Sequence, residues 1–178
     1  MKRILLATSI VALLVAGAIN TARATEVGYG RKFGLGIELG DPTGIVGKLW
    51  LSNVNALDFG FGFQHYGWGR CYYDQANVRR CGYQDYSFNV DYLWQSNIVR
   101  GPAQLDWHVG VGGRVYFLGE PADTRNRDFN IAARAPIGLD LMFNTPAFLE
   151  VFFEVAPALY LLPLDFGIEG GLGVRFYF

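Results

Sequence analysis

The sequence predicts an all-β fold, an eight-stranded, antiparallel, up-and-down transmembrane β-barrel. Three observations lead to this prediction. Eight segments alternate apolar residues with polar residues or glycine, the chain closes on an apolar strand that ends at Phe178, and an apolar leader with a basic start opens it. A β-strand points successive side chains to opposite faces, so each alternating segment has one apolar face. We find no helical periodicity of any length.

The first alternating segment sets the pattern for the others. Its odd-numbered residues, from Phe33 to Leu39, are apolar, and its even-numbered residues are glycines and Glu38. Asp41–Gly44 then predicts a tight turn, because proline fixes φ and glycine permits unusual backbone angles. The eight segments run over residues 33–40, 45–51, 57–64, 86–94, 105–117, 129–141, 149–156 and 166–178. The second of them has the weakest pattern.

The leader predicts export. Lys2 and Arg3 precede the apolar run Ile4–Ile19, and Ala22–Ala24 forms an A-x-A cleavage site. This layout is typical of a secretory signal peptide (residues 1–24), and the run is short for a spanning helix. Residues 25–178 then form one barrel domain. The whole chain has 15 basic and 16 acidic residues, and the few, scattered basic residues argue against nucleic acid as a partner.

The amount of apolar surface decides which face points outward. About forty residues lie on the apolar faces of the eight segments. The interior of an eight-stranded barrel is only just wide enough for side chains. The apolar faces must therefore point outward, which lipid requires and water does not tolerate. The glycine-rich polar faces should leave room inside for four large aromatic residues, Trp50, Tyr116, Phe152 and Tyr177.

The same alternation predicts a charged interior. The residues expected to form a polar network in the lumen are Glu38, Lys48, Asp58, Asp91, Asp106, His108, Arg114, Arg134, Asp140, Glu150, Glu154, Glu169 and Arg175. Buried charges are costly unless they are paired, so we expect salt bridges that plug the barrel. Eight of these residues are acids, and this surplus leaves open a narrow cation-preferring channel.

Catalytic, metal and cofactor sites are not predicted. Asp106 and His108 share a face, as half of an acid–base pair would, but no serine lies nearby in the sequence. Outer-membrane lipid A deacylases carry a His-x-Ser-Asn element, and the residues after His65 and His108 do not match it. Two isolated histidines give no recognised metal spacing.

The segment from about Gly67 to Gln84 predicts an extracellular loop. It holds Cys71 and Cys81, which we expect to form a disulfide in an exported chain. Tyrosine, tryptophan and arginine dominate binding hot spots. The candidate contact residues in this loop are Trp68, Arg70, Tyr72, Tyr73, Arg79, Arg80 and Tyr83. An ordinary exposed loop, stapled against proteolysis, is the alternative.

Two prolines oppose the strand assignments. Pro136 and Pro157 lie inside the sixth and seventh segments, where a missing N–H donor is costly. The turn at Asn144–Pro146 should bring the two prolines close together. A shared β-bulge would accommodate them.

The chain resembles the small eight-stranded outer-membrane barrels of Gram-negative bacteria, the OmpA-type barrel domain and its OmpX/Ail-like relatives. The resemblance rests on Gly34–Gly36, the Gly-Asp-Pro-Thr-Gly first turn, Leu149–Pro157 and the glycine-rich aromatic end. It is nearest to uncharacterised members with this first turn. Val174, Phe176 and Phe178 look like the C-terminal assembly signal of such barrels, which implies contact with the barrel assembly machinery.

This resemblance implies outer-membrane residence, lipopolysaccharide and lipid as surroundings, and no cofactor. It implies roles in adhesion, envelope integrity or slow solute passage. We therefore expect a non-enzymatic, porin-like barrel with a closed lumen and a structural or surface-interaction role. A narrow channel is the first alternative. The second is a periplasmic lipocalin-like binding protein, whose apolar residues would point inward.

Overall fold

The computed structural model describes residues 31–65, 71–73, 79–81, 84–117, 129–143, 149–161 and 164–178. The strands are β1 (Phe33–Asp41), β2 (Thr43–Trp50), β3 (Asn55–His65), β4 (Cys71–Tyr73), β5 (Arg79–Cys81), β6 (Gln84–Val99), β7 (Ala103–Phe117), β8 (Phe129–Arg134), β9 (Ile137–Phe143), β10 (Leu149–Leu161) and β11 (Leu164–Tyr177). Within these residues, no helix is long and apolar enough to cross a membrane. The predicted leader, residues 1–24, lies outside the described residues.

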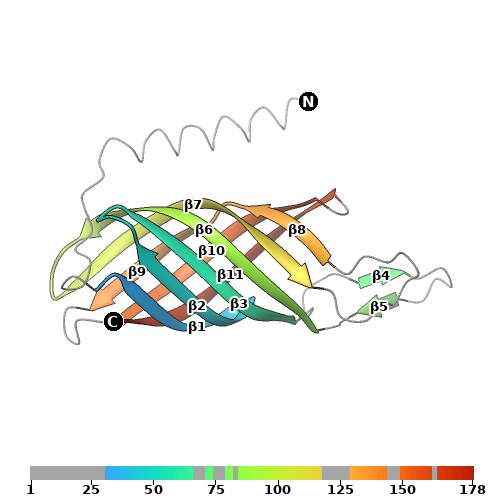
Figure 1. Cartoon of the computed structure of the whole chain (residues 1–178), viewed down its shortest axis with the longest axis horizontal. Helices are drawn as coiled ribbons and strands as arrows, with labels where there is room; N and C mark the ends of the chain where they lie inside the picture. Colours follow the sequence, from blue (N-terminus) through green and yellow to red (C-terminus); the bar gives the residue numbers. More distant parts are fainter. Residues whose placement is uncertain are drawn as a thin grey trace, which may run out of the picture.

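The main sheet closes on itself. Strands pair antiparallel in the order β1, β2, β3, β6, β7, then β8 and β9 end to end, β10 and β11, and β11 pairs again with β1. β8 and β9 together occupy one position between β7 and β10, so the ring has eight positions (Figure 1). The predicted fold class, an eight-stranded antiparallel up-and-down barrel, is confirmed.

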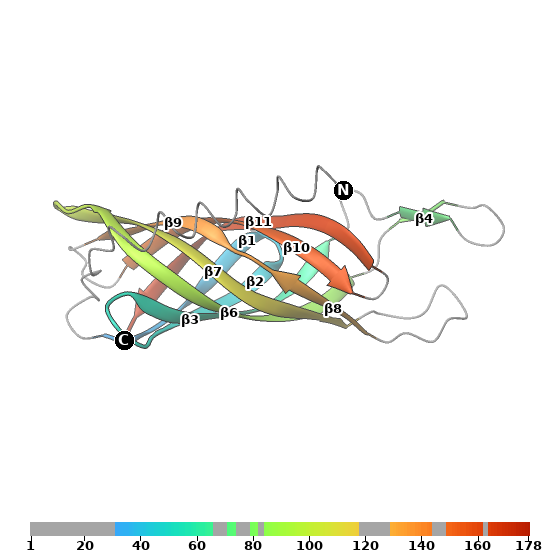
Figure 2. The same cartoon turned by 90° about the horizontal axis from the view of Figure 1, so that it is seen from above.

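The two ends of the barrel differ. We call the end that holds Phe33 and Phe178 the terminus end, and the opposite end, toward which β4 and β5 project, the loop end (Figure 2). β4 and β5 form a separate two-stranded sheet that pairs Cys71 with Cys81. The sequence analysis treated this stretch as loop alone, because three-residue strands are too short to show alternation.

The prolines lie at neighbouring positions of the β8–β9 and β10 pairing, without a bulge. Val155 pairs with Ile137 and Ala158 with Arg134, so the same number of residues separates the two pairs on each side. The expectation of a shared bulge is therefore wrong. Each proline instead removes one bond from the ladder, since paired residues of this kind normally exchange two.

The remaining bonds of those pairs are present. Ala135 N donates to Pro157 O at 3.0 Å, and Gly110 N donates to Pro136 O at 2.8 Å. The return bonds would need the N–H groups that proline lacks. The ladder therefore weakens at one level of the wall, between β8 and β9, while the register continues across it.

The β1–β2 connection is the shortest at the loop end. β1 ends at Asp41 and β2 begins at Thr43, close to the predicted turn at Asp41–Gly44. Gly40 has φ of 152°, and a Cβ there would lie 2.3 Å from Gly170 O. Only glycine fits both conditions. The Thr43 hydroxyl donates to Gly40 O at 3.0 Å and accepts from Gly40 N at 3.2 Å, which satisfies the turn's own polar groups.

The polarity of the barrel is inverted relative to a water-soluble domain. Its buried interior holds charged and polar side chains, and its apolar side chains point outward from every strand of the ring. On β1, Ile37 and Leu39 are 56% and 65% exposed, whereas Glu38 between them is 9% exposed. The core of the molecule is therefore the lumen.

Candidate functional site in the barrel lumen

The lumen collects all of the predicted polar network. Its thirteen residues are at most 9% exposed, although they come from all nine strands of the ring. Period-two alternation places them there, because each occupies the face of its strand opposite to the apolar residues. The four predicted lumen aromatics are buried as well: Trp50, Tyr116, Phe152 and Tyr177.

Arg175 organises the middle of the lumen. Its Nη2 lies 2.5 Å from Asp58 Oδ2 and its Nη1 lies 2.7 Å from Glu150 Oε1. The guanidinium also stacks on the Phe152 ring, 3.7 Å from the ring centre. Tyr177 donates its hydroxyl proton to Glu150 Oε2 at 2.6 Å. Arginine suits this position because its planar fork can satisfy two carboxylates and an aromatic face at once.

A second set of pairs extends from Glu150 across the lumen. Lys48 Nζ lies 3.5 Å from Glu150 Oε2 and 3.4 Å from Asp140 Oδ1. Asp140 Oδ2 lies 2.6 Å from His108 Nδ1, and His108 Nε2 lies 3.2 Å from Glu154 Oε2. His108 therefore joins two carboxylates. The sequence analysis considered an acid–base pair of His108 with Asp106, but the partners of His108 are Asp140 and Glu154.

The third set reaches the loop end. Arg134 pairs with Glu154, and its Nε lies 3.5 Å from Asp91 Oδ1 and 3.8 Å from Glu169 Oε2. Arg114 Nη1 lies 2.8 Å from the same Glu169 oxygen. The three sets share Glu150 and Glu154, so one continuous chain of alternating charges runs along the lumen. Such a chain stabilises its members jointly, because removal of one cation leaves two buried acids uncompensated.

Tyrosines form a layer across the loop end of the lumen. Tyr116 donates to Glu169 and lies 3.3 Å from the Tyr160 hydroxyl, and Tyr160 donates to Glu169 Oε1 at 3.0 Å. Ala132 and Ala158 pack with the two rings. The small alanines leave the space that the two tyrosine rings occupy, on the loop-end side of the charge network.

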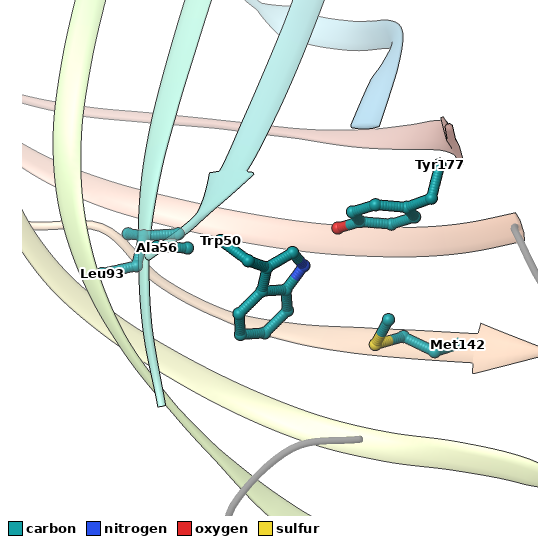
Figure 3. Close-up of a cluster of buried hydrophobic side chains, with 5 residues drawn as sticks. All are labelled: Trp50, Ala56, Leu93, Met142 and Tyr177. Atoms are coloured by element: carbon teal, nitrogen blue, oxygen red, sulfur yellow. The ribbon is translucent and has the colours of Figure 1, made fainter. Parts of the chain in front are cut away.

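A cluster of buried hydrophobic residues lies inside the terminus end. It consists of Trp50, Ala56, Leu93, Met142 and Tyr177 (Figure 3). Beside it, Asp106 accepts hydrogen bonds from Gln95 at 3.0 Å, Asn97 at 2.8 Å and Gln104 at 2.8 Å. Three amide donors therefore satisfy the carboxylate of Asp106 without a cation.

Glycines on β11 make room for the network. A Cβ on Gly171 would lie 2.3 Å from Glu38 Oε1, and a Cβ on Gly173 would lie 2.3 Å from the Phe152 ring. The two glycines are therefore required by close approach of side chains from other strands. In the described part of the chain, no three histidine, cysteine, aspartate or glutamate side chains lie where they could share a metal ion.

The outer-face predictions have the following positions. Phe176 and Phe178 are 45% and 70% exposed on the outer surface near the terminus end, and Val174 lies on the same face, partly exposed. Of the loop contact candidates, Tyr72 and Tyr73 lie on β4, and Arg79 and Arg80 lie on β5. Trp68, Arg70 and Tyr83 fall outside the described residues. The register of β4 and β5 places Cys71 opposite Cys81, and the disulfide itself stays a prediction.

Several lumen residues were missed from the sequence. They are Ser87, Asn89, Gln95, Asn97, Gln104, Asn130, Met142 and Tyr160. The neutral amides were available from the alternation, because Gln95 and Gln104 continue the faces of Asp91 and Asp106. Most of these residues carry no charge and are not large aromatics, which were the two signals used to choose lumen residues. In addition, β6 and β7 extend further toward the terminus end than the pattern indicated.

Comparisons with known proteins give a likeness in fold. No family model matches the chain, and no curated protein sequence matches it. Among solved structures, the N-terminal β-barrel domain of Pseudomonas aeruginosa OprF is similar, with a TM-score of 0.58 and 15% sequence identity. The likeness covers 83% of this chain and 96% of that domain. The chain therefore has the same barrel fold as that domain.

Proposed function

We propose that the protein is an outer-membrane β-barrel with a closed, salt-bridged lumen, and that it serves a structural or surface-interaction role through its loop end. The observation that carries this proposal is the inverted polarity of the wall. Apolar side chains point outward all around the ring, whereas the strand acids and bases are buried inside. Water would oppose this arrangement, and lipid favours it.

Closure of the ring supports the same proposal. Every strand position has a neighbour on both sides over most of its length, so the backbone donors and acceptors are satisfied within the sheet. A sheet in hydrocarbon requires this. Aromatic residues on the outer surface, such as Tyr86 and Trp94 at 45% and 47% exposure, also suit the interfaces of a bilayer.

The likeness to the OprF barrel domain supports the sequence-based resemblance to OmpA-type barrels at the level of fold. The orientation follows from the same class of protein, in which longer loops face outside and short turns face the periplasm. In this orientation the loop end is extracellular, and β4 and β5 project from the cell surface. The periplasmic lipocalin-like alternative is disfavoured, because it needs apolar side chains in the interior.

The closed lumen rests on two obstructions at different levels. The tyrosine layer lies at the loop end, and the apolar cluster around Trp50 lies at the terminus end. The charge network fills the space between them. A filled lumen of this kind is enough for a structural role, because the network stabilises the fold and leaves no path for solutes.

A narrow cation-preferring channel is the second candidate. The eight lumen acids outnumber the four bases and His108, which favours cations over anions along any path that opens. Rearrangement of both end layers would be needed before ions could pass.

Reconstitution tests the proposal. The chain is refolded into lipid vesicles, its heat-modifiable gel mobility is measured, and the same preparation is fused with a planar bilayer for conductance recordings. We expect a mobility shift that shows a folded barrel, and no reproducible conductance. A soluble form without membrane insertion would contradict the outer-membrane proposal, and steady conductance would favour the channel.

A further inference from the structure

The wall of the barrel changes height abruptly between two neighbouring strands. β1 ends at Asp41, which pairs with Gly170 of β11, whereas β11 continues to Leu164. A strand rises about 3.3 Å per residue and tilts by about 40° in such barrels, so the end of β11 stands about 15 Å above the β1–β2 turn. The β10–β11 hairpin extends beyond β1 toward the loop end (Figures 1 and 2).

The backbone of β11 is unpaired on this side. Phe178 N donates to Phe33 O at 2.8 Å, so the even-numbered residues of β11 direct their backbone groups toward β1. Above Gly170 these residues are Leu164, Phe166 and Ile168. In the described part of the chain, no strand lies opposite them. Phe166 N donates instead to Asp165 Oδ1 at 2.8 Å.

The side chains of the same three residues are exposed and apolar. Leu164, Phe166 and Ile168 are 75%, 63% and 69% exposed, which places them among the most exposed apolar residues of the described chain. We call these three residues the β11 edge. Uncovered apolar side chains and unpaired backbone groups therefore coincide at the same positions.

One kind of occupant satisfies both features. Lipid covers apolar side chains but returns no hydrogen bond to a backbone N–H group, and water pairs with the backbone but leaves the side chains uncovered. An added β-strand does both. We propose that the β11 edge binds an extended strand of a partner polypeptide, which pairs antiparallel with β11 and continues the line of β1.

The inner face of the edge indicates the chemistry of that strand. Asp165 and Gly167 alternate with the edge residues on β11, whereas Glu169 below them is already paired with Arg114 at 2.8 Å. Cross-strand pairs favour opposite charges, so the partner strand should carry a basic residue opposite Asp165, a small residue opposite Gly167 and apolar residues at its outer positions. Such a strand would extend the β1–β11 ladder.

A second copy of this chain does not fit. Two identical edges that pair antiparallel are related by a two-fold axis perpendicular to the sheet. In a membrane this axis would invert the second barrel relative to the first. The exclusion of a second copy and the orientation of the loop end rest on the proposed function. The strand-addition surface itself rests only on the closed barrel fold.

A synthetic peptide tests the inference. The probe is a fluorescent peptide with the sequence of β1 in which lysine replaces glutamate, Glu38→Lys, and its anisotropy is measured against the full chain refolded in detergent micelles and in phosphatidylcholine vesicles. Two further probes carry N-methyl groups on alternate residues, one along each edge of the peptide. We expect saturable binding in both media, and a loss of about tenfold in affinity for one methylation pattern only.

Two variants of the chain provide the matched control. Ile168→Lys changes the β11 edge, and Phe117→Lys changes an outward residue at the loop end of β7, which does not pair with β11. We expect about tenfold weaker peptide binding for Ile168→Lys and unchanged binding for Phe117→Lys. Heat-modifiable gel mobility reports folding, and Ile168→Thr replaces Ile168→Lys where the latter does not fold.

Three results would overturn the inference. They are no saturable binding up to about 100 μM, equal loss for both methylation patterns or both variants, and binding in micelles but none in vesicles, which would show that lipid covers the edge. Failure to insert into vesicles contradicts the proposed function instead, and the micelle measurement still decides this inference.

Discussion

Removal of the Arg175 side-chain charge is the sharpest test of the lumen network. We expect Arg175→Met to destabilise the barrel by about 3–5 kcal/mol, because Asp58 then loses its arginine and Glu150 keeps only Lys48, at 3.5 Å. The two ion pairs have N–O distances of 2.5 and 2.7 Å. At an effective dielectric constant of about 20, each gives about 6 kcal/mol of attraction before desolvation, so the expected net loss is smaller than the gross loss of about 13 kcal/mol.

The measurement is urea unfolding of the refolded chain in vesicles, followed by tryptophan fluorescence and gel mobility. A triple variant, Arg175→Met with Asp58→Asn and Glu150→Gln, is the control. It removes the charges of both carboxylates and keeps the shape of the site, so it should recover about half of the lost stability or more. A single variant within about 1 kcal/mol of the wild type would refute the reasoning. So would a triple variant that is no more stable than the single one.

Three other expectations follow from the wall and the end layers. Phe61→Arg should lower the free energy of unfolding in vesicles by about 2–4 kcal/mol, and Leu161→Arg should lower it by about 0–1 kcal/mol, because only Phe61 lies near the middle of the apolar belt. Equal losses would contradict these assigned depths. Gly173→Val should impair folding in a gel mobility assay, since its Cβ would meet the Phe152 ring at 2.3 Å, whereas Gly113→Ala, with no atom closer than 3.4 Å, should fold normally. Trp50→Ala and Tyr116→Ala should each leave planar-bilayer conductance near zero and the double variant should conduct; conductance in either single variant would show that one layer alone closes the lumen.

The alternation of side chains carried most of the fold prediction. Period two is a local property of each segment, and one face of each segment is unmistakably apolar from Phe33 to Leu39 and from Leu149 to Val155. The count of apolar residues against the size of an eight-stranded lumen then determined which face points outward. The structure agrees at single residues: the Glu38 side chain is buried, and the neighbouring Ile37 side chain is exposed.

The sequence could not predict which side chains pair with each other in the lumen. Alternation places His108 on the inner face but does not say which strand lies across the barrel. Its partners Asp140 and Glu154 come from β9 and β10, and their approach depends on the stagger between strands as the ring closes. Asp106 shares a strand and a face with His108, so the sequence suggested that they pair, but Asp106 instead accepts hydrogen bonds from Gln95, Asn97 and Gln104.

The backbone hydrogen bonds around the two prolines could not be predicted from the sequence either. A bulge is the commonest way for a strand to accommodate proline, and the sequence offered no other. The structure places Ala135 opposite Pro157 and Pro136 one residue further along, so each proline uses a position where its carbonyl still accepts a bond. Which residues exchange bonds depends on the register of neighbouring strands, and register is fixed by closure of the ring.

The arrangement of charge explains how the barrel can have an uneven rim at the loop end. Interior stability comes from pairs that cross the barrel, such as Lys48 with Asp140 and Arg175 with Asp58, and these pairs lie below the level of the β1–β2 turn. The wall above that level is held by β6, β7, β8, β10 and β11, with the Tyr116 layer inside it. Because the lower pairs connect strands on opposite sides of the ring, the lower part of the barrel is held together without the upper portion of β1 and β2, and in the described part of the chain the β11 edge stays open to another strand.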